Sequence, residues 1–375
     1  MPDLLMRFPR EGATSRVHVA DGALERVGVF TRRVTASRRV ALVSDERVAA
    51  LYAERALGAL RRAGIAATLI AVPHGERSKS TATLARLWSA FAALGLGREG
   101  AVVALGGGVI GDLGGFAAAT WARGVPWVGV PTSLMAQVDS GIGGKTGIDL
   151  PEGKNLAGSF HQPAGVLVDP RLLQTLPARE RRSGLAEVVK LGMVRDAALF
   201  AWVEREASAL AAGDARTLAR VVARAIRVKA GVVVRDQRER RAGVRSSLNF
   251  GHTLGHALEA ALGYRRLRHG EAVAIGMCVA ADLSVRTARL APSSGHRLES
   301  LIEALGLPRR IPGVRLEPLL LAMRSDKKGA GRAGFGGGSE HVRWVLTPRV
   351  GHASVPRLVS GRLVRSALLD AGARA

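Results

Sequence analysis

The first half of the chain alternates short apolar runs with amphipathic stretches, and this alternation predicts its fold. The run RRVALVSDERV ends an apolar segment at Ser44 and Asp45 and leads into a helix-like stretch, Val48 to Ala63. Three later segments show the same order of an apolar run and a polar turn: ATLIAVPHGERSKS, VPWVGVPTSLMAQVDS and GVLVDPRLLQTLP. Apolar runs of strand length between helices indicate a parallel sheet covered by helices on both faces.

The pattern changes after Pro177. From Arg179 to about Arg310, apolar residues recur at spacings of three and four in segments rich in alanine, leucine and arginine, which is typical of long amphipathic helices. The predicted boundary lies near Leu176–Ala178. We therefore expect an α/β domain over residues 1–177 and an all-α domain over residues 178–375.

Two smaller elements are expected near the C-terminus. Val345 and Leu346 predict a short strand, and the glycine-rich segment Gly329–Glu340 predicts a flexible loop.

Bulk composition fits a cytoplasmic globular protein. The 375 residues are 47% hydrophobic and 23% charged, enough for two domains with separate cores. The single cysteine, Cys278, excludes an internal disulfide and fits a reducing compartment. The apolar stretch Ala272–Ala281 is too short to span a bilayer, and MPDLLMRFPREG carries charges where a signal peptide needs an apolar core.

The formal net charge of +24 is that of many nucleic-acid binders, but its distribution argues against that class. Arginines are spread along the whole chain, and aromatic residues, at 4%, are too few for base-stacking surfaces. A small anionic substrate accounts for part of the charge. Seven of the 55 basic residues are lysines, and a lysine in so arginine-rich a chain suggests a role that arginine cannot fill.

A glycine-rich turn follows the apolar run AVVAL. Gly106, Gly108 and Gly111 match the G-x-G-x-x-G pattern, in which backbone and helix N-terminus approach a pyrophosphate. The usual acidic companion about 20 residues downstream is absent, so a plain tight turn stays open as an alternative. Asp45 ends an earlier strand, the position where open α/β sheets bind ligands.

The run SLNFGHTLGHALEA predicts a metal site. His252, His256 and Glu259 fall on one stripe of a helix, and the His252–His256 spacing is common in zinc sites. Two further polar residues stand in apolar helical runs: Glu187 in GLAEVVKLG and His269 at the start of a helix in RHGEAVAIGM. Burying Glu187 unpaired would cost several kcal/mol, which a metal or a cationic partner would remove.

Another run, QVDSGIGGKTGIDLPEGKN, places Asp139, Lys145, Lys154 and Asn155 on what we interpret as one glycine-rich loop. These runs and those above, through PHGERSKS, GKNLAGSFHQP and a final DKK, occur in one order along nearly the whole chain. In that order they resemble the 3-dehydroquinate synthase family of sugar phosphate cyclases. The resemblance implies a Rossmann-like NAD-binding α/β domain followed by an all-α metal-binding domain.

The resemblance also implies roles for individual residues. It places a divalent metal, zinc first and cobalt as an alternative, on Glu187, His252 and His269, and makes His256 a substrate contact. The NAD site it implies is formed by Asp45, Glu76, Lys79, Gly108, Val109, Ile110, Gly111, Asp112, Thr132, Ser133, Lys145, Lys154, Leu172, Leu173, Gln174 and Thr175. The residues it directs at the substrate are Asp139, Lys145, Asn155, Lys190, Lys229, Arg245, Asn249 and His256, with Lys327 or Lys328 on its phosphate. Arg123 matches an arginine lent to a neighbouring subunit, which implies a homodimer.

The implied activity converts 3-deoxy-D-arabino-heptulosonate 7-phosphate to 3-dehydroquinate and phosphate in the shikimate pathway. Three alternatives remain: a related cyclase acting on glucose 6-phosphate or sedoheptulose 7-phosphate, a metal-dependent alcohol dehydrogenase of the same fold, and a nucleotide-binding protein without catalysis. The first alternative has less use for Arg245 and Lys229, because its substrates lack a carboxylate. An intact set of Glu187, His252 and His269 argues against the third.

The chain departs from the family pattern at a few positions. Gly141 stands where the family commonly has a second serine, and Asp149 where it has an asparagine. The extra carboxylate puts the hydrogen bonding of its loop in question. The segment between Lys229 and Arg245 is slightly longer than usual.

Overall fold

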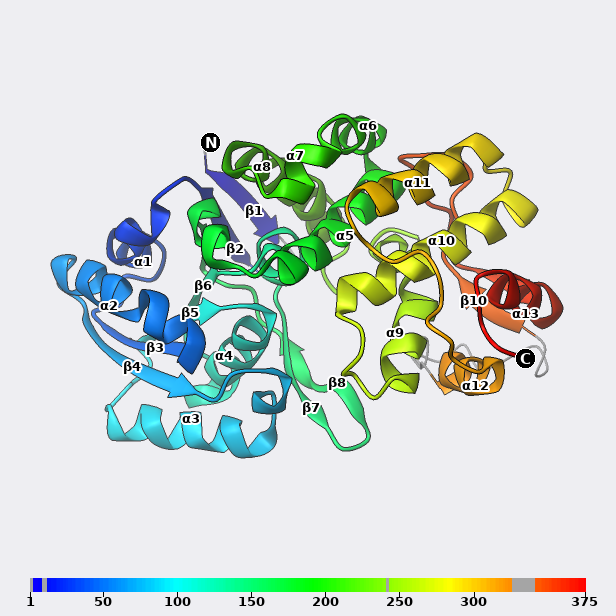
Figure 1. Ribbon diagram of the computed structural model, residues 1–375. Coiled ribbons are helices and arrows are strands. Elements are labelled where there is room, and N and C mark those ends of the chain that lie inside the picture. The colour runs from blue at the N-terminus through cyan, green and yellow to red at the C-terminus, as the bar shows by residue number, and fades with distance from the viewer. Residues whose placement is uncertain (1–2, 9–11, 241–242, 326–340) are drawn as a thin grey trace. The chain divides into compact units, whose positions relative to one another are not determined.

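The computed structural model describes residues 3–8, 12–240, 243–325 and 341–375 (Figure 1). The chain forms two compact units. The first contains Met1–Leu176 together with Leu218–Val234, and the second contains Pro177–Thr217 and Arg235–Ala375. The predicted single boundary at residue 177 therefore misses a return of the chain: most of helix α8 (Ala215–Arg235) belongs with the first unit.

The first unit is built on a seven-stranded sheet of order β1-β2-β9-β6-β5-β3-β4. The β1–β2 pair is antiparallel and every other pair is parallel, as the alternation of strands and helices predicts. The strands are β1 (Leu4–Phe8), β2 (Ala13–Val19), β3 (Arg39–Asp45), β4 (Ala66–Val72), β5 (Ala101–Gly106), β6 (Trp127–Pro131) and β9 (Gly165–Val168).

Both faces of this sheet are covered by apolar side chains. Along β3, Leu42 packs into one core, and its neighbours Ala41 and Val43 pack into the other, because successive side chains of a strand point to opposite faces. The first core also takes side chains from α1 (Val27–Thr35) and α2 (Glu46–Arg62), and the second from α3 (Thr81–Ala93) and α4 (Gly108–Thr120). This arrangement explains why the central strands read as continuous apolar runs.

The segment interpreted as a single glycine-rich loop is a β-hairpin instead. It contains β7 (Lys145–Leu150) paired antiparallel with β8 (Gly153–Phe160), preceded by a short π-helical turn, Ala136–Ser140. A Cβ atom on Gly158 would lie 2.1 Å from the Thr146 carbonyl oxygen. The glycine is therefore needed for close strand pairing, whereas the sequence pattern suggested only a turn.

The second unit is mainly helical. Its helices are α5 (Ala178–Arg195), α6 (Ala197–Arg205), α7 (Ala207–Ala212), α9 (His252–Ala261), α10 (His269–Thr287), α11 (Pro292–Ala304), α12 (Leu316–Ser325) and α13 (Gly361–Asp370). It also contains a hairpin of β10 (His341–Trp344) and β11 (Arg357–Ser360). The strand predicted at Val345 and Leu346 is wrong by position, because β10 ends at Trp344.

Two further expectations concern segments at the edge of this description. The loop predicted at 329–340 and the phosphate contacts predicted at Lys327 and Lys328 lie outside the described residues. Among the helices that are described, none combines the length and the apolarity needed to cross a membrane.

Candidate metal centre and nucleotide-binding residues

Three helices of the second unit bring Glu187, His252 and His269 together. Glu187 lies in α5, His252 begins α9 and His269 begins α10. One ligand atom from each of the three lies within 4.8 Å of the others. The Nε2 atoms of both histidines are 3.6 Å from the same oxygen, Glu187 Oε1, which is too long for a hydrogen bond.

Two glycines of α10 allow this approach. A Cβ atom on Gly270 would lie 1.9 Å from the carbonyl oxygen of Ser183 in α5. A Cβ atom on Gly276 would lie 1.9 Å from the carbonyl oxygen of Gly251, the residue before His252. Only residues without a side chain fit at these two crossings, so the sequence itself sets how closely α5 and α9 approach α10.

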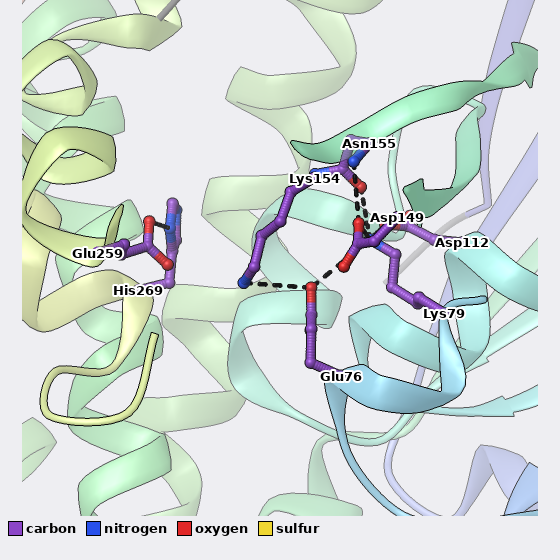
Figure 2. A network of polar contacts seen from close by, with 8 residues as sticks. All are labelled: Glu76, Lys79, Asp112, Asp149, Lys154, Asn155, Glu259 and His269. Atoms are coloured by element: carbon purple, nitrogen blue, oxygen red, sulfur yellow. Dashed lines mark hydrogen bonds and ion pairs between the residues drawn. The ribbon is translucent and has the colours of Figure 1, made fainter. Parts of the chain in front are cut away.

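The second nitrogen of each imidazole faces a hydrogen-bond acceptor. His252 Nδ1 lies 3.2 Å from the carbonyl oxygen of Phe250, and His269 Nδ1 lies 3.0 Å from Glu259 Oε2 (Figure 2). Both acceptors call for a proton on Nδ1, which directs Nε2 of both rings to the Glu187 side. Bonds of 2.0–2.2 Å to a tetrahedral zinc ion would separate neighbouring ligand atoms by roughly 3.4 Å, close to the spacing observed.

The charge on Glu187 also favours a cation. Its carboxylate is fully buried, and neither oxygen has a regular hydrogen bond among the described residues, although Lys190 of the same helix forms an ion pair with it. Burial works against ionisation, but Lys190 and His269 hold the pKa of Glu187 well below its usual range. Despite burial, the carboxylates of Glu187 and Glu259 raise the pKa of His269 to about 9. The donor set and its charge therefore fit a divalent ion.

The zinc pair suggested by spacing alone, His252 with His256, does not fall in one candidate set. Their rings lie edge to face, with centroids 5.3 Å apart. In the part of the chain that the structure describes, His256 instead groups with Glu259 and His269, again within 4.8 Å. His269 is common to both sets, so two arrangements of ligands compete for it.

Arg245 and Asn249, two other predicted residues of the second unit, lie beside and on a short 3-10 helix, Ser246–Asn249. Arg245 is buried and donates to the carbonyl oxygen of Gln237, and Asn249 Nδ2 donates to Glu239 Oε1 at 2.9 Å. The sequence analysis missed Glu239. Its backbone has a positive φ of 55°, which is unusual for a residue other than glycine and marks a constrained turn.

In the first unit, Lys79 is the centre of a polar network (Figure 2). It follows the 3-10 turn Glu76–Ser78, is 4% exposed, and places Nζ 2.9 Å from Asp112 Oδ2 and 2.5 Å from Asn155 Oδ1. Asp149 Oδ1 is 3.7 Å away, and the Asp149 amide donates to the Lys79 carbonyl oxygen. The network thus ties the β7–β8 hairpin to the N-terminal turn of α4.

More carboxylates than ammonium groups take part in this network. Glu76 Oε1 is 3.8 Å from Lys79 Nζ and 3.3 Å from Lys154 Nζ. Burial raises the pKa of Asp112 to about 6, against the effect of Lys79, and burial likewise raises the pKa of Asp149. The carboxylates of Asp112 and Glu76 raise the pKa of Lys79 in spite of its burial.

The glycine-rich turn lies at the carboxyl end of β5 and opens α4. Gly107 is the N-cap and provides no side-chain acceptor, so the first amide groups of α4 depend on other partners. A Cβ atom on Gly111 would meet nothing within 4 Å, whereas one on Gly108 would lie 3.0 Å from Ser140 Oγ. A cavity of about 20 Å³ is lined by Gly108, Gly111 and Lys145, among others. The uncapped amides and the open space beside Gly111 fit a pyrophosphate approached by backbone amides, whereas the cavity itself has room for about one water molecule.

The remaining cofactor contacts implied by the resemblance lie in two segments of the first unit, one at Thr132 and Ser133 and the other at Leu172–Thr175. Thr132 is buried, and Ser133 Oγ accepts the Ala136 amide. The segment Leu172–Thr175 lies in a 3-10 helix, Pro170–Thr175, where Tyr52 contacts both the Leu172 carbonyl oxygen and Thr175 Oγ1. These contacts fix the segment within the first unit.

Asp45 has a structural role of its own. Its carboxylate accepts the amides of Arg47 and Val48 at the start of α2, and His74 Nδ1 lies 2.9 Å away. His74 is a second polar residue that the sequence analysis did not identify. Asp45 therefore has hydrogen-bond partners within the protein at the end of β3, independently of any ligand.

Three further predicted residues, Asp139, Lys229 and Arg123, lie in the first unit. Lys229, on α8, forms an ion pair with Asp139, so the structure brings together two residues that were predicted to contact the substrate. Arg123 is exposed at the end of the turn Trp121–Arg123, where Ala122 and Arg123 both have positive φ values, 48° and 66°. This conformation is uncommon for residues with side chains and indicates a constrained turn.

Comparisons with known proteins identify the family of the chain. Residues 69–183 match the model of the 3-dehydroquinate synthase N-terminal domain, and residues 184–329 match that of the C-terminal domain. A 3-dehydroquinate synthase from Symbiobacterium thermophilum is 47% identical over 353 residues, which cover 93% of this chain and 95% of the relative. The chain belongs to the 3-dehydroquinate synthase family. Another 3-dehydroquinate synthase, from Gloeobacter violaceus, is 44% identical over 93% of this chain and 94% of the relative's length.

Solved structures agree on the fold of this family. A 2-epi-5-epi-valiolone synthase from Streptomyces hygroscopicus subsp. jinggangensis 5008, with NAD⁺ and Zn²⁺ bound, is 29% identical with a TM-score of 0.82 and coverage of 94% and 95%. A 2-deoxy-scyllo-inosose synthase complexed with carbaglucose-6-phosphate, NAD⁺ and Co²⁺ is 24% identical, with a TM-score of 0.89 and coverage of 98% and 100%, and speaks for the fold alone. The family, the fold class and the expectation of an enzyme are confirmed.

Proposed function

We propose that this protein converts 3-deoxy-D-arabino-heptulosonate 7-phosphate to 3-dehydroquinate and phosphate. The observation that carries the proposal is the convergence of Glu187, His252 and His269 in a chain 47% identical to a 3-dehydroquinate synthase. The reaction comprises transient oxidation of an alcohol, elimination of phosphate, re-reduction and intramolecular aldol closure.

The cofactors we assign are NAD and one divalent metal ion, zinc first and cobalt as the alternative. Glu187, His252 and His269 would hold the ion, and the glycine turn with Glu76, Lys79, Asp112 and Lys154 would hold NAD. When bound, the ion supplies a Lewis acid that lowers the pKa of an alcohol, and NAD accepts and returns a hydride. The 29% identical 2-epi-5-epi-valiolone synthase, which contains NAD⁺ and Zn²⁺, supports this assignment.

The substrate residues would neutralise and orient an anion. A carboxylate and a phosphate together carry about three negative charges near neutral pH. Lys145, Lys229 and Arg245, with Lys327 or Lys328, would balance this charge and hold a flexible sugar acid in one geometry. We assign Lys190 and Asn249 to the substrate hydroxyls, and His256 and Asn155 to the phosphate.

Arg245 and Lys229 favour this reaction over its relatives. Glucose 6-phosphate and sedoheptulose 7-phosphate have no carboxylate for these two cations to bind. A metal-dependent alcohol dehydrogenase would not return the hydride, and so would release NADH.

One assay tests these possibilities together. Purified protein with NAD, Zn²⁺ and the heptulosonate phosphate should release inorganic phosphate with no net NADH absorbance. Phosphate release only from a sugar phosphate without a carboxylate, such as glucose 6-phosphate, would favour another cyclase. Steady NADH accumulation would favour a dehydrogenase.

We also propose a cytoplasmic homodimer in which Arg123 completes the partner's site. The constrained turn that presents this exposed arginine supports the idea. Mixing Arg123→Ala protein with His252→Ala protein tests it, because subunit exchange would unite one intact metal centre with one intact Arg123. Recovery of activity in the mixture is expected. A mixture as inactive as its two parents would contradict the lent arginine.

A further inference from the structure

Glu259 contacts His269 through a hydrogen bond that the proposed reaction does not use directly. Glu259 lies in the last turns of α9 and is only 8% exposed, and its Oε2 atom is 3.0 Å from Nδ1 of His269 at the start of α10 (Figure 2). The carboxylate therefore contacts the ring nitrogen opposite to the one facing Glu187. A hydrogen bond to a charged acceptor is stronger than one between neutral groups.

The two histidines of the set differ in this respect. His252 Nδ1 faces the carbonyl oxygen of Phe250, at 3.2 Å, which is part of the backbone two residues earlier. His269 Nδ1 faces a full negative charge carried by a side chain. A carboxylate acceptor orients the ring and increases the electron density on the opposite nitrogen more than a carbonyl does.

We propose that Glu259 is a positioning residue of the metal centre, which holds His269 with Nδ1 protonated and Nε2 directed at the ion. This inference rests on the proposed metal site at Glu187, His252 and His269. It adds a residue beyond the three ligands and assigns it a measurable effect, which is to raise the affinity for a divalent ion. Glu259 touches neither substrate nor ion in this role.

The competing arrangement makes Glu259 a ligand. His256, Glu259 and His269 offer ligand atoms within 4.8 Å of one another, so an ion could in principle be bound there. A proton on His269 Nδ1, shared with Glu259, occupies the space between the two atoms that such an ion would need. The 3.0 Å contact therefore favours orientation over ligation, and the two possibilities predict different variants to be sensitive.

The test is the affinity of the full chain for Zn²⁺, measured by competition with a chromophoric chelator. Glu259→Ala should bind Zn²⁺ about 10- to 100-fold more weakly than wild type, the usual effect of removing an outer partner of a ligand. Glu259→Gln should lie between the two, because its amide oxygen still accepts the N–H but carries no charge. Glu204→Ala is the matched control: it breaks a two-bond ion pair with Arg297 in the same unit and should leave Zn²⁺ affinity unchanged.

Three results would overturn the inference or its basis. Glu259→Ala binding Zn²⁺ within about twofold of wild type would remove the positioning role. His256→Ala losing as much affinity as Glu259→Ala would make the second set the true site. Retention of Zn²⁺ by His252→Ala would instead overturn the proposed metal centre, independently of Glu259. If the metal-free Glu259→Ala protein melts early, Glu259→Gln, which preserves volume, carries the test.

Discussion

The proposed metal-ligand set of the second unit consists of Glu187, His252 and His269. It and the Lys79 network of the first unit are both partly buried polar clusters, but their charges are arranged differently. Around Glu187, two imidazole nitrogens each lie 3.6 Å from the same carboxylate oxygen, and the carboxylate has no regular hydrogen bond among the residues described. Around Lys79, each short contact joins an ammonium group to an oxygen. In the first cluster, Lys190 pairs with Glu187 Oε2 and both histidines face Oε1 beyond hydrogen-bond distance, which fits an added cation. In the second cluster, Lys79 and Lys154 already contact the carboxylates directly.

The comparison indicates where each cluster gets its stability. The metal-ligand set depends on backbone crossings at Gly270 and Gly276, which hold it in place without an ion. The Lys79 network depends on one side chain that joins the turn after β4, helix α4 and the β7–β8 hairpin. The fold around the metal-ligand set should therefore remain stable without a metal ion. The Lys79 network should lose stability when Lys79 is replaced.

The largest effect is expected from His252→Ala, which removes one of the three proposed ligands and should abolish bound metal. His256→Ala should retain the ion, because in the proposed centre it is not a ligand. Metal analysis of the two purified variants by mass spectrometry measures this. Loss of metal from His256→Ala with retention in His252→Ala would reverse the ligand assignment.

Lys79→Met should destabilise the protein by about 3 kcal/mol, since it leaves Asp112 and Asp149 without their cation in a poorly hydrated site. Lys154→Met is the matched control: the Lys154 side chain is 29% exposed and pairs with Glu76 at 3.3 Å, so its loss should lower the unfolding free energy by about 1 kcal/mol or less. Urea unfolding compares the two. Equal losses would mean that the network is not organised around Lys79.

Gly276→Ala should lower the free energy of unfolding by roughly 1–3 kcal/mol. The new Cβ would lie 1.9 Å from the carbonyl oxygen of Gly251, so α9 and α10 would have to separate. Gly295→Ala in α11 is the control, since the nearest atom to its Cβ is a flexible side-chain carbon at 3.6 Å. The control should be neutral or more stable by up to about 1 kcal/mol through helix propensity. Thermal unfolding, with Zn²⁺ affinity as a second readout, tests whether the crossing sets the ligand spacing.

The smallest effect concerns pH. The pKa of Asp112 is raised from 3.8 to about 6 in the folded protein, so the folded state binds more protons between these values than the unfolded state does. The contribution of Asp112 to stability is therefore greatest at low pH and falls as pH rises through about 6. Relative to Asp112→Asn, wild type should lose roughly 1–2 kcal/mol of unfolding free energy from pH 4 to pH 7. Parallel stability curves for the two proteins would contradict the shift.

The sequence predicts the fold class well, because strand length and period depend on local patterning. It does not predict which unit a helix joins: α8 has the amphipathic pattern of its neighbours, yet residues 218–234 pack with the first unit. The β7–β8 hairpin was missed because glycines needed for close strand pairing resemble those of a loop.

For the metal-ligand set, local spacing and family resemblance suggest different ligands, and one of the two groups of ligand atoms that the structure brings together consists of the residues implied by the resemblance. His252 and His256 are four residues apart on one helix, but the structure groups His252 with residues from two other helices. That grouping depends on where α5, α9 and α10 cross in the folded protein, which the spacing of residues along one helix cannot predict. Glu239 went unnoticed because its one signal, a left-handed backbone conformation, is visible only in coordinates.

The return of α8 has a consequence for how the chain is made. The ribosome releases residues in order, and the first unit lacks a helix until residue 234 has emerged, well after the sheet is complete. Until then Asp139 has no Lys229 to pair with. Nascent chains halted after residue 177 should therefore be readily digested by protease, and those long enough to expose residue 234 should be protected.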